Sequence, residues 1–85
     1  MENTMSHLRR TYDGPTKIYF VTSNTYQRVP LFRINENARS VIKNIKFLEK
    51  RKDIIIIAYV IMPDHIHLLF EIISNMNVSQ VMHSI

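Results

Sequence analysis

IIIIAYVIMPDHIHLLFEII, residues 54–73, is the stretch that decides the fold of this 85-residue chain. Its first part, Ile54 to Met62, is apolar throughout and rich in β-branched residues, which predicts a strand buried on both faces. Pro63-Asp64 supplies turn chemistry, and the alternating segment from His65 to Ile73 follows it. Two strands joined by so short a turn are expected to pair as an antiparallel hairpin.

The alternation in the second strand separates a core face from a partly polar face, because successive side chains point to opposite sides of a sheet. The core face carries apolar side chains only: Ile66, Leu68, Phe70 and Ile72. The other face carries His65, His67, Leu69, Glu71 and Ile73. We therefore expect one side of this strand to build the core while the other presents two histidines.

Three further elements are predicted around the hairpin. Residues 17–24 are β-branched and aromatic, which indicates a strand. A helix is predicted with Asn35 as its N-cap and cations at its C-terminal end. Its apolar residues recur at helical spacing: Ala38, Val41, Ile42, Ile45 and Leu48. A second helix begins at the capping-box pattern of Asn77 and Gln80. Its apolar residues are Val78, Val81, Met82 and Ile85.

The predicted order is β-α-β-β-α, and the fold class is α+β. This order corresponds to a ferredoxin-like split βαβ core, an antiparallel sheet with helices on one face. The helical pattern stops at an apolar position, Ile85, without a C-cap, so we expect a chain cut short before a final strand. We predict an N-terminal arm at residues 1–16 and one core domain at 17–85, incomplete at its C-terminus.

Composition excludes several classes of protein. Hydrophobic residues make up 46% of the chain, enough for a core, and one glycine argues against low-complexity sequence. The absence of cysteine excludes disulfides and thiolate metal sites. No signal-peptide pattern is present, and the longest apolar run has nine residues, too few to span a membrane. We therefore predict a cytoplasmic protein without membrane contact.

Basic residues give the chain a formal net charge of +4 and a pI of about 9.7, which permits a nucleic-acid partner. Four of them lie within about 60° of one another on the first predicted helix: Arg39, Lys43, Lys46 and Lys50. This basic ridge is either an ordinary solvated face or a DNA-binding surface. In the second case the expected phosphate contacts are Arg9, Arg10, Arg39, Lys43 and Lys46.

His65 and His67 are the candidate metal ligands. At positions i and i+2 of a strand they point the same way from Cα atoms about 7 Å apart, so both imidazoles reach one ion. Two neutral imidazoles suit a divalent ion whose other positions stay open to water or phosphate oxygen. Asp64 is a candidate for orienting one ring, and Glu71 lies on the same face but farther along. A bare pair of this kind is more often structural, and no third ligand is evident.

The surroundings of the pair resemble the signature of the single-tyrosine HUH transposases. The family pattern is a strand, then Met-Pro-Asn/Asp, His-hydrophobic-His and aliphatic residues, and this chain has Ala58-Tyr59-Val60-Ile61-Met62-Pro63-Asp64-His65-Ile66-His67-Leu68-Leu69. Upstream, the segment most similar to the REP-associated tyrosine transposases is Arg9-Arg10, then Tyr19-Phe20-Val21-Thr22, Thr25, Arg28, Pro30, Leu31 and Phe32. The resemblance covers residues 9–85.

The resemblance implies a mechanism as well as the ferredoxin-like fold. It implies that His65 and His67 hold Mg²⁺ or Mn²⁺, which polarises the scissile phosphate of single-stranded, hairpin-forming DNA. It implies a phosphotyrosine intermediate made by a tyrosine on a downstream helix. It also implies a homodimer that needs no small-molecule cofactor and is associated with the nucleoid when on DNA.

The chain departs from the family pattern at the nucleophile. Its four tyrosines all precede the histidine pair: Tyr12, Tyr19, Tyr26 and Tyr59. None of them matches the family's nucleophile, so none is assigned that role. We expect the chain to keep the metal-binding half of the site, to lack the covalent half, and not to cleave DNA by itself.

Three hypotheses remain open at this point. The first is a DNA transposase fragment, inactive alone. The second is a catalytically dead DNA-binding or dimerisation module that modulates a full-length transposase. The third is a ferredoxin-like domain with structural histidines, which associates with other chains through an unpaired sheet edge.

Overall fold

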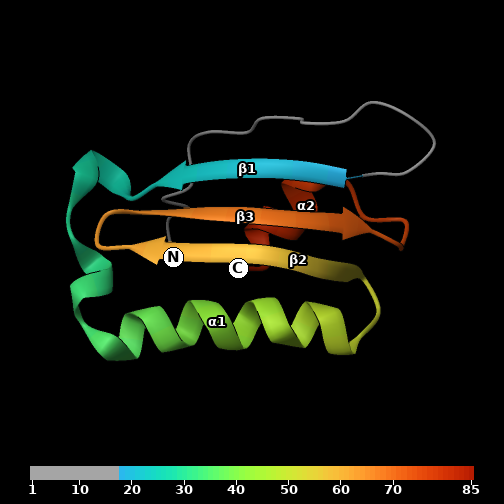
Figure 1. Ribbon diagram of the computed structural model, residues 1–85, viewed down its shortest axis with the longest axis horizontal. Coiled ribbons are helices and arrows are strands. Elements are labelled where there is room, and N and C mark those ends of the chain that lie inside the picture. The colour runs from blue at the N-terminus through green and yellow to red at the C-terminus, as the bar shows by residue number, and fades with distance from the viewer. Residues whose placement is uncertain (1–17) are drawn as a thin grey trace.

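The central strand of the sheet is the alternating segment of the sequence. A computed structural model of the protein describes residues 18–85, where β3 (His65–Ile72) pairs antiparallel with β2 (Ile54–Met62) and with β1 (Ile18–Asn24). Figure 1 shows this three-stranded sheet in the order β1-β3-β2. The predicted hairpin through Pro63-Asp64 is confirmed, as is the first strand over its described residues.

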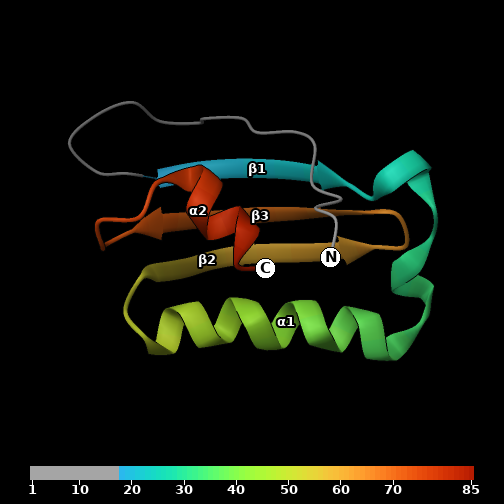
Figure 2. The same ribbon diagram turned by 180° about the vertical axis from the view of Figure 1, so that it is seen from behind.

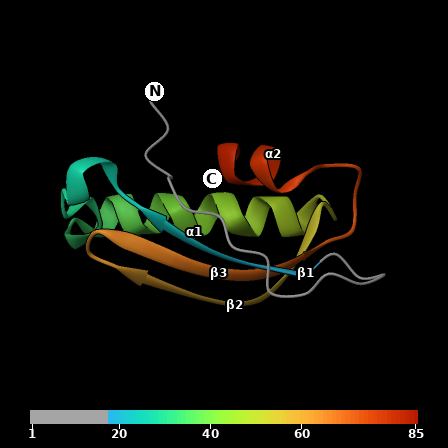
Figure 3. The ribbon, with the colours of Figure 1, turned by 90° about the horizontal axis from the view of Figure 1, so that it is seen from above.

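Both helices lie on the same side of the sheet, as Figure 3 shows. Helix α1 (Asn35–Lys50) follows β1 after two short 3₁₀ turns, η1 (Tyr26–Arg28) and η2 (Leu31–Arg33). Helix α2 (Val78–His83) lies in front of the sheet in Figure 2, and α1 runs beside β2 in the same view. The α+β class, the β-α-β-β-α order and the placement of helices on one face are therefore confirmed. No helix within residues 18–85 is long and apolar enough to cross a bilayer.

The core lies between β3 and the two helices. The predicted core face of β3 is confirmed, because none of its residues is more than 4% exposed: Ile66, Leu68, Phe70 and Ile72. The apolar stripe of α1 is buried at Val41, Ile45 and Leu48, and that of α2 at Val78, Val81 and Met82. The face of the sheet away from the helices, called here the open face, has no such cover among residues 18–85.

The prediction that β2 is buried on both faces is wrong. Its outward residues are between 41% and 51% exposed: Ile55, Ile57, Val60 and Met62. The reason is that both helices cover the same face, and that β2 is an edge strand. The register also shifts between Ile56 and Ala58, so β2 carries one extra residue at this bulge.

The helix ends differ from the sequence prediction at one of the two N-termini. The N-cap of α1 is Ile34 and not Asn35, because the Ile34 carbonyl already accepts the amides of Asn37 and Ala38. At the end of α1, Lys52 adopts a left-handed φ of 65°, and the amide of Asp53 donates to the Leu48 carbonyl. This is a Schellman-type termination. The predicted capping box of α2 is confirmed: Asn77 and Gln80 each accept the other's backbone amide at 2.8 Å.

Candidate metal centre and basic helix face

The histidine pair lies at the start of β3, on the open face of the sheet. The rings of His65 and His67 are 4.9 Å apart between centroids and meet edge to face at 84°. The side chain of His65 is 21% exposed, so it is partly shielded yet reachable from solvent. The structure therefore brings the two imidazoles together as the i, i+2 spacing predicts.

The ring of His67 is fixed from strand β1. Thr22 is its cross-strand partner, and the Thr22 Oγ1 atom lies 3.1 Å from Nδ1 of His67. Phe20 stacks on the same ring, with centroids 5.6 Å apart and planes 10° apart. With Nδ1 engaged by the hydroxyl, the remaining nitrogen of His67 for a metal is Nε2.

The ring of His65 is fixed by a carboxylate. Nδ1 of His65 donates to Oδ1 of Asp64 at 2.8 Å, and Nε of Arg28 donates to Oδ2 of the same group at 2.9 Å. These hydrogen bonds, first from His65 and then from Arg28, hold the pKa of Asp64 below its ordinary value of 3.8. An ionised carboxylate only accepts hydrogen bonds, so Nδ1 of His65 carries the hydrogen, and in the neutral form of the ring Nε2 is then the acceptor. The structure thus places Asp64 against the His65 ring, and its role in orienting a metal ligand stays a prediction.

The turn that holds Asp64 is attached to the connection after β1. The amide of Thr25 donates to the Asp64 carbonyl at 2.9 Å, and the Thr25 hydroxyl lies 2.6 Å from the Val29 carbonyl and 3.1 Å from the Asp64 carbonyl. The amide of Phe32 donates to the Pro63 carbonyl at 2.9 Å. Two backbone segments that are far apart in the sequence thereby make one support for the site.

Sequence reasoning assigned no role to Phe20, Thr22 or Arg28. The two β1 residues reach His67 only through the β1–β3 register, which the chain order does not reveal. Arg28 reaches the site across 36 residues of sequence. The one available signal was that all three residues belong to the segment that resembles the transposase pattern.

Within residues 18–85, no group of three or more histidine, aspartate or glutamate side chains is arranged to hold a metal, so the pair has no third protein ligand there. Glu71 is on the open face, but it pairs with Ile18 and Ile55 at the other end of the strands. The exposed ring of His83 lies on α2, where Nδ1 contacts the Ser79 carbonyl at 3.0 Å. Two anchored imidazoles with open positions still fit a divalent ion that keeps water or takes phosphate oxygen.

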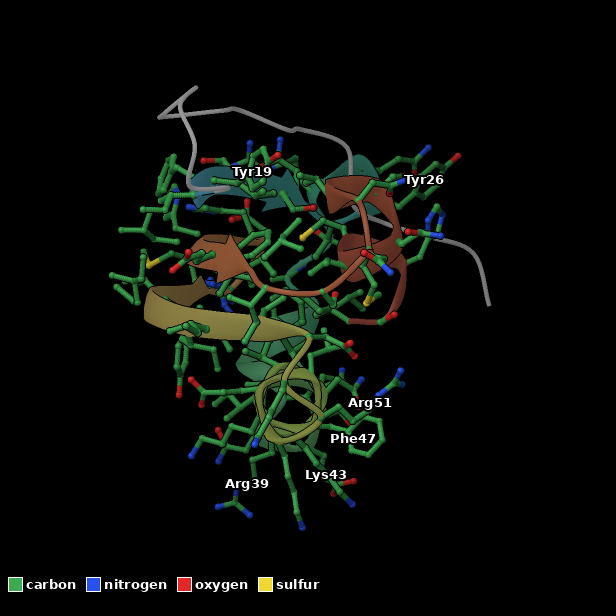
Figure 4. The ribbon with its side chains drawn as sticks, turned by 90° about the vertical axis from the view of Figure 1, so that its right-hand side faces the viewer. Tyr19, Tyr26, Arg39, Lys43, Phe47 and Arg51 are labelled. Atoms are coloured by element: carbon green, nitrogen blue, oxygen red, sulfur yellow. The ribbon has the colours of Figure 1, made fainter. Side chains whose placement is uncertain are left out.

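The basic ridge lies on the outer side of α1. All four of its predicted members are exposed: Arg39, Lys43, Lys46 and Lys50. Figure 4 shows Arg39 and Lys43 pointing away from the sheet, with Phe47 and Arg51 close to each other on the same helix end. The other two predicted phosphate contacts, Arg9 and Arg10, lie outside the described residues.

Phe47 is an aromatic side chain within the basic face that sequence reasoning did not single out. Its side chain is 55% exposed, although most of the apolar residues of α1 face the core. The guanidinium of Arg51 lies 5.6 Å from its ring centroid, and Nε of Arg51 forms an ion pair with Asp53 at 3.1 Å. An exposed ring among cations is a feature that single-stranded nucleic-acid sites use for base stacking.

The described residues thus form an α+β domain with two histidines on one face of its sheet and a row of cations on an outer helix. The family model described as "Transposase IS200 like" matches residues 15–85. Because this match covers most of the chain, the protein belongs to the family of IS200-like transposases. No curated protein and no solved structure matches the chain.

Proposed function

We propose that this chain provides the metal-binding part of an IS200-like transposase that cleaves and rejoins single-stranded, hairpin-forming DNA. The observation that carries the proposal is the geometry of His65 and His67. Both rings lie on the open face, and each has its Nδ1 atom engaged by a neighbouring side chain, which leaves Nε2 for a metal. Membership in the family supports the transposase class.

In this proposal each side chain has a physical role. His65 and His67 hold Mg²⁺ or Mn²⁺ through Nε2. When bound there, the ion supplies Lewis-acid polarisation of a DNA phosphate. Asp64 keeps the His65 ring in the required tautomer, and Thr22 does so for His67 by accepting from its Nδ1.

The basic ridge is proposed to bind the DNA backbone. Arg39, Lys43 and Lys46 are exposed and close enough in rotation about α1 to follow one strand. Phosphate contacts of this kind position a nucleic acid without selecting its sequence. Phe47 adds an exposed ring on which an unpaired base of the same strand stacks.

The covalent step is proposed to need a tyrosine that these 85 residues do not provide. All four tyrosines precede the histidines in the sequence. Tyr19 and Tyr59 pack against the core, and Tyr26 is exposed on η1; Tyr12 lies outside the described residues. We expect hairpin DNA incubated with this chain and Mg²⁺ to give no covalent protein–DNA adduct on a denaturing gel. An adduct that disappears in Tyr26→Phe would contradict this expectation.

The metal site is tested by Mn²⁺ titration of the chain, followed by electron paramagnetic resonance. The double variant His65→Ala/His67→Ala is expected to abolish site-specific binding while leaving the thermal unfolding transition in place. His83→Ala is the matched control, because this histidine is exposed on α2 and points to Ser79. Equal Mn²⁺ binding by the double variant and by the wild type would refute the proposed site.

A second candidate function is a DNA-binding or dimerisation module that modulates a full-length transposase. The exposed cations and Phe47 on α1 favour it, because they need no catalytic step. The exposed apolar residues of the edge strand β2 favour association between copies. Light scattering behind size exclusion tests the homodimer. Salt-sensitive hairpin binding by the His65→Ala/His67→Ala variant would support the module.

A further inference from the structure

We propose that Arg28 is a positioning residue for the metal ligand His65, acting through Asp64. The inference rests on the metal site proposed above and adds to it a residue that does not touch the metal. The chain of contacts runs from Nε of Arg28 to Oδ2 of Asp64 at 2.9 Å, and from Oδ1 of Asp64 to Nδ1 of His65 at 2.8 Å.

The backbone at Arg28 and at the residue before it has an uncommon conformation. Gln27 and Arg28 have φ angles of 52° and 58°, in the left-handed region that residues with a Cβ atom avoid. Such conformations persist where the surrounding structure enforces them, and they cluster at functional sites. Here the amide of Arg28 donates to the Thr25 carbonyl at 3.0 Å, and Thr25 is itself bonded to the Asp64 carbonyl.

The carboxylate of Asp64 is held at both oxygens. A rotation of the group that keeps its bond to His65 would lose its bond to Arg28, and the reverse also holds. The carboxylate plane is therefore set by Arg28, and the plane in turn sets the direction from which it accepts the hydrogen of His65. This arrangement fixes the ring orientation and its tautomer, the two properties that a metal ligand needs.

The role of Arg28 is orientation more than stability. Its side chain is 58% exposed, so water screens its attraction to Asp64. Arginine nevertheless presents Nε–H in a rigid planar group, whereas lysine offers a freely rotating ammonium. The exchange of Arg28 for lysine keeps the charge and removes the directed donor.

The test compares Arg28→Ala, Arg28→Lys and Asp64→Ala with the wild type in two measurements. The first is Mn²⁺ affinity by titration calorimetry. The second is the ¹⁵N chemical shift of the His65 ring nitrogens without metal, which reports the tautomer. Arg33→Ala is the matched control, because Arg33 is an exposed arginine of the same connection and its loss changes the charge equally.

The wild type is expected to show hydrogen at Nδ1 of His65. Asp64→Ala should lower Mn²⁺ affinity about tenfold or more, in the range seen when a partner of a ligand histidine is lost. Arg28→Ala should lower it by about threefold to tenfold, because it acts one contact farther away. Arg28→Lys should fall between Arg28→Ala and the wild type, with mixed tautomers, and Arg33→Ala should match the wild type.

The inference would be overturned if Arg28→Ala and Arg28→Lys both kept the tautomer and the Mn²⁺ affinity of the wild type. A loss of hairpin-DNA affinity in Arg28→Ala at unchanged Mn²⁺ affinity would also overturn it, because Arg28 would then be a phosphate contact. Mn²⁺ binding that is unchanged in His65→Ala/His67→Ala would refute the metal site itself, and this result is distinct from the two above. In that case the tautomer shift in metal-free Arg28→Ala still decides whether Arg28 positions His65. If Arg28→Ala does not fold, Arg28→Lys supplies both measurements.

Discussion

The two faces of strand β3 share one backbone and serve different purposes. On the inner face, Leu68 and Phe70 are fully buried under the helices. On the open face, His65 and His67 remain partly accessible, with ring nitrogens directed by neighbouring side chains. The packing that stabilises this sheet therefore lies on one face of β3, and the side chains proposed for metal binding lie on the other, one residue apart along the chain.

The largest expected effect comes from shortening adjacent leucines on opposite faces. Leu68→Ala should cost about 2–5 kcal/mol of unfolding free energy, because it opens a cavity in a closely packed core. That amounts to a large fraction of the stability of a small domain. Leu69→Ala, on the half-buried open face, should cost less than about 1.5 kcal/mol. Urea unfolding of both variants measures the difference, and equal losses would break the contrast between the faces.

A smaller effect is expected from the helix that covers the inner face. Asn77→Ala removes the side chain that accepts the Gln80 amide at 2.8 Å, so α2 should fray. Loss of an N-cap costs about 1 kcal/mol. Thermal unfolding should show the loss, and hydrogen exchange should increase at the amides of α2. Asn77→Asp keeps an acceptor and serves as the control; a loss equal to that of Asn77→Ala would argue against the capping role.

A change on the solvent side should weaken DNA binding and leave folding intact. Lys43→Ala/Lys46→Ala removes two of the proposed phosphate contacts, and each contact to single-stranded DNA contributes about 0.7 to the salt dependence. The slope of log affinity against log salt should therefore fall by about 1.4. Fluorescence anisotropy with a labelled hairpin measures it. Lys43→Arg/Lys46→Arg keeps the charges and should keep the slope; an unchanged slope in the alanine variant would remove α1 from the interface.

The smallest expected effect is a pH dependence at the open face. The folded-state pKa of Asp64 is lowered by hydrogen bonds from His65 and then from Arg28. Its ionised form therefore stabilises the fold above the ordinary value of 3.8, and this contribution is lost as pH falls through the lower folded-state value. The effect on stability should be slight, because the side chains of Asp64 and Arg28 are 27% and 58% exposed and water screens their attraction. Carboxyl ¹³C titration should show the pKa rising in Arg28→Ala; an unchanged value would show that Arg28 does not act on this carboxylate.

Much of the fold follows from periodicity. The alternation of β3 identified its buried face correctly, because a strand that lies between two others and under helices on one side must alternate. The 3.6-residue spacing identified the buried stripe of α1. The turn at Pro63-Asp64 fixed the hairpin, and with it the neighbours of the histidines on β2.

The rest depends on information that periodicity does not contain. An apolar run such as Ile54 to Met62 does not reveal whether one or both of its faces are covered, and here only one is. Thr22 and Phe20 reach His67 through a pairing that sequence order leaves open. Arg28 reaches Asp64 from a segment in which Gln27 and Arg28 both have left-handed backbone angles. The sequence does not predict these angles, because neither position is a glycine.

The bulge in β2 divides the hairpin into an end that tolerates a shift in strand register and an end that does not. Residues 54–57 are all isoleucine. If the extra residue of the bulge moved by one position within this run, every position on either face would still be an isoleucine. Nearer the turn, Ala58 to Met62 are all different, and each is matched to its partner on β3 up to Met62 opposite His65. We therefore expect the insertion or deletion of one isoleucine to leave the pairing next to the histidines unchanged. The two histidines proposed as metal ligands thus occupy the end of the sheet where an alignment error is least tolerated.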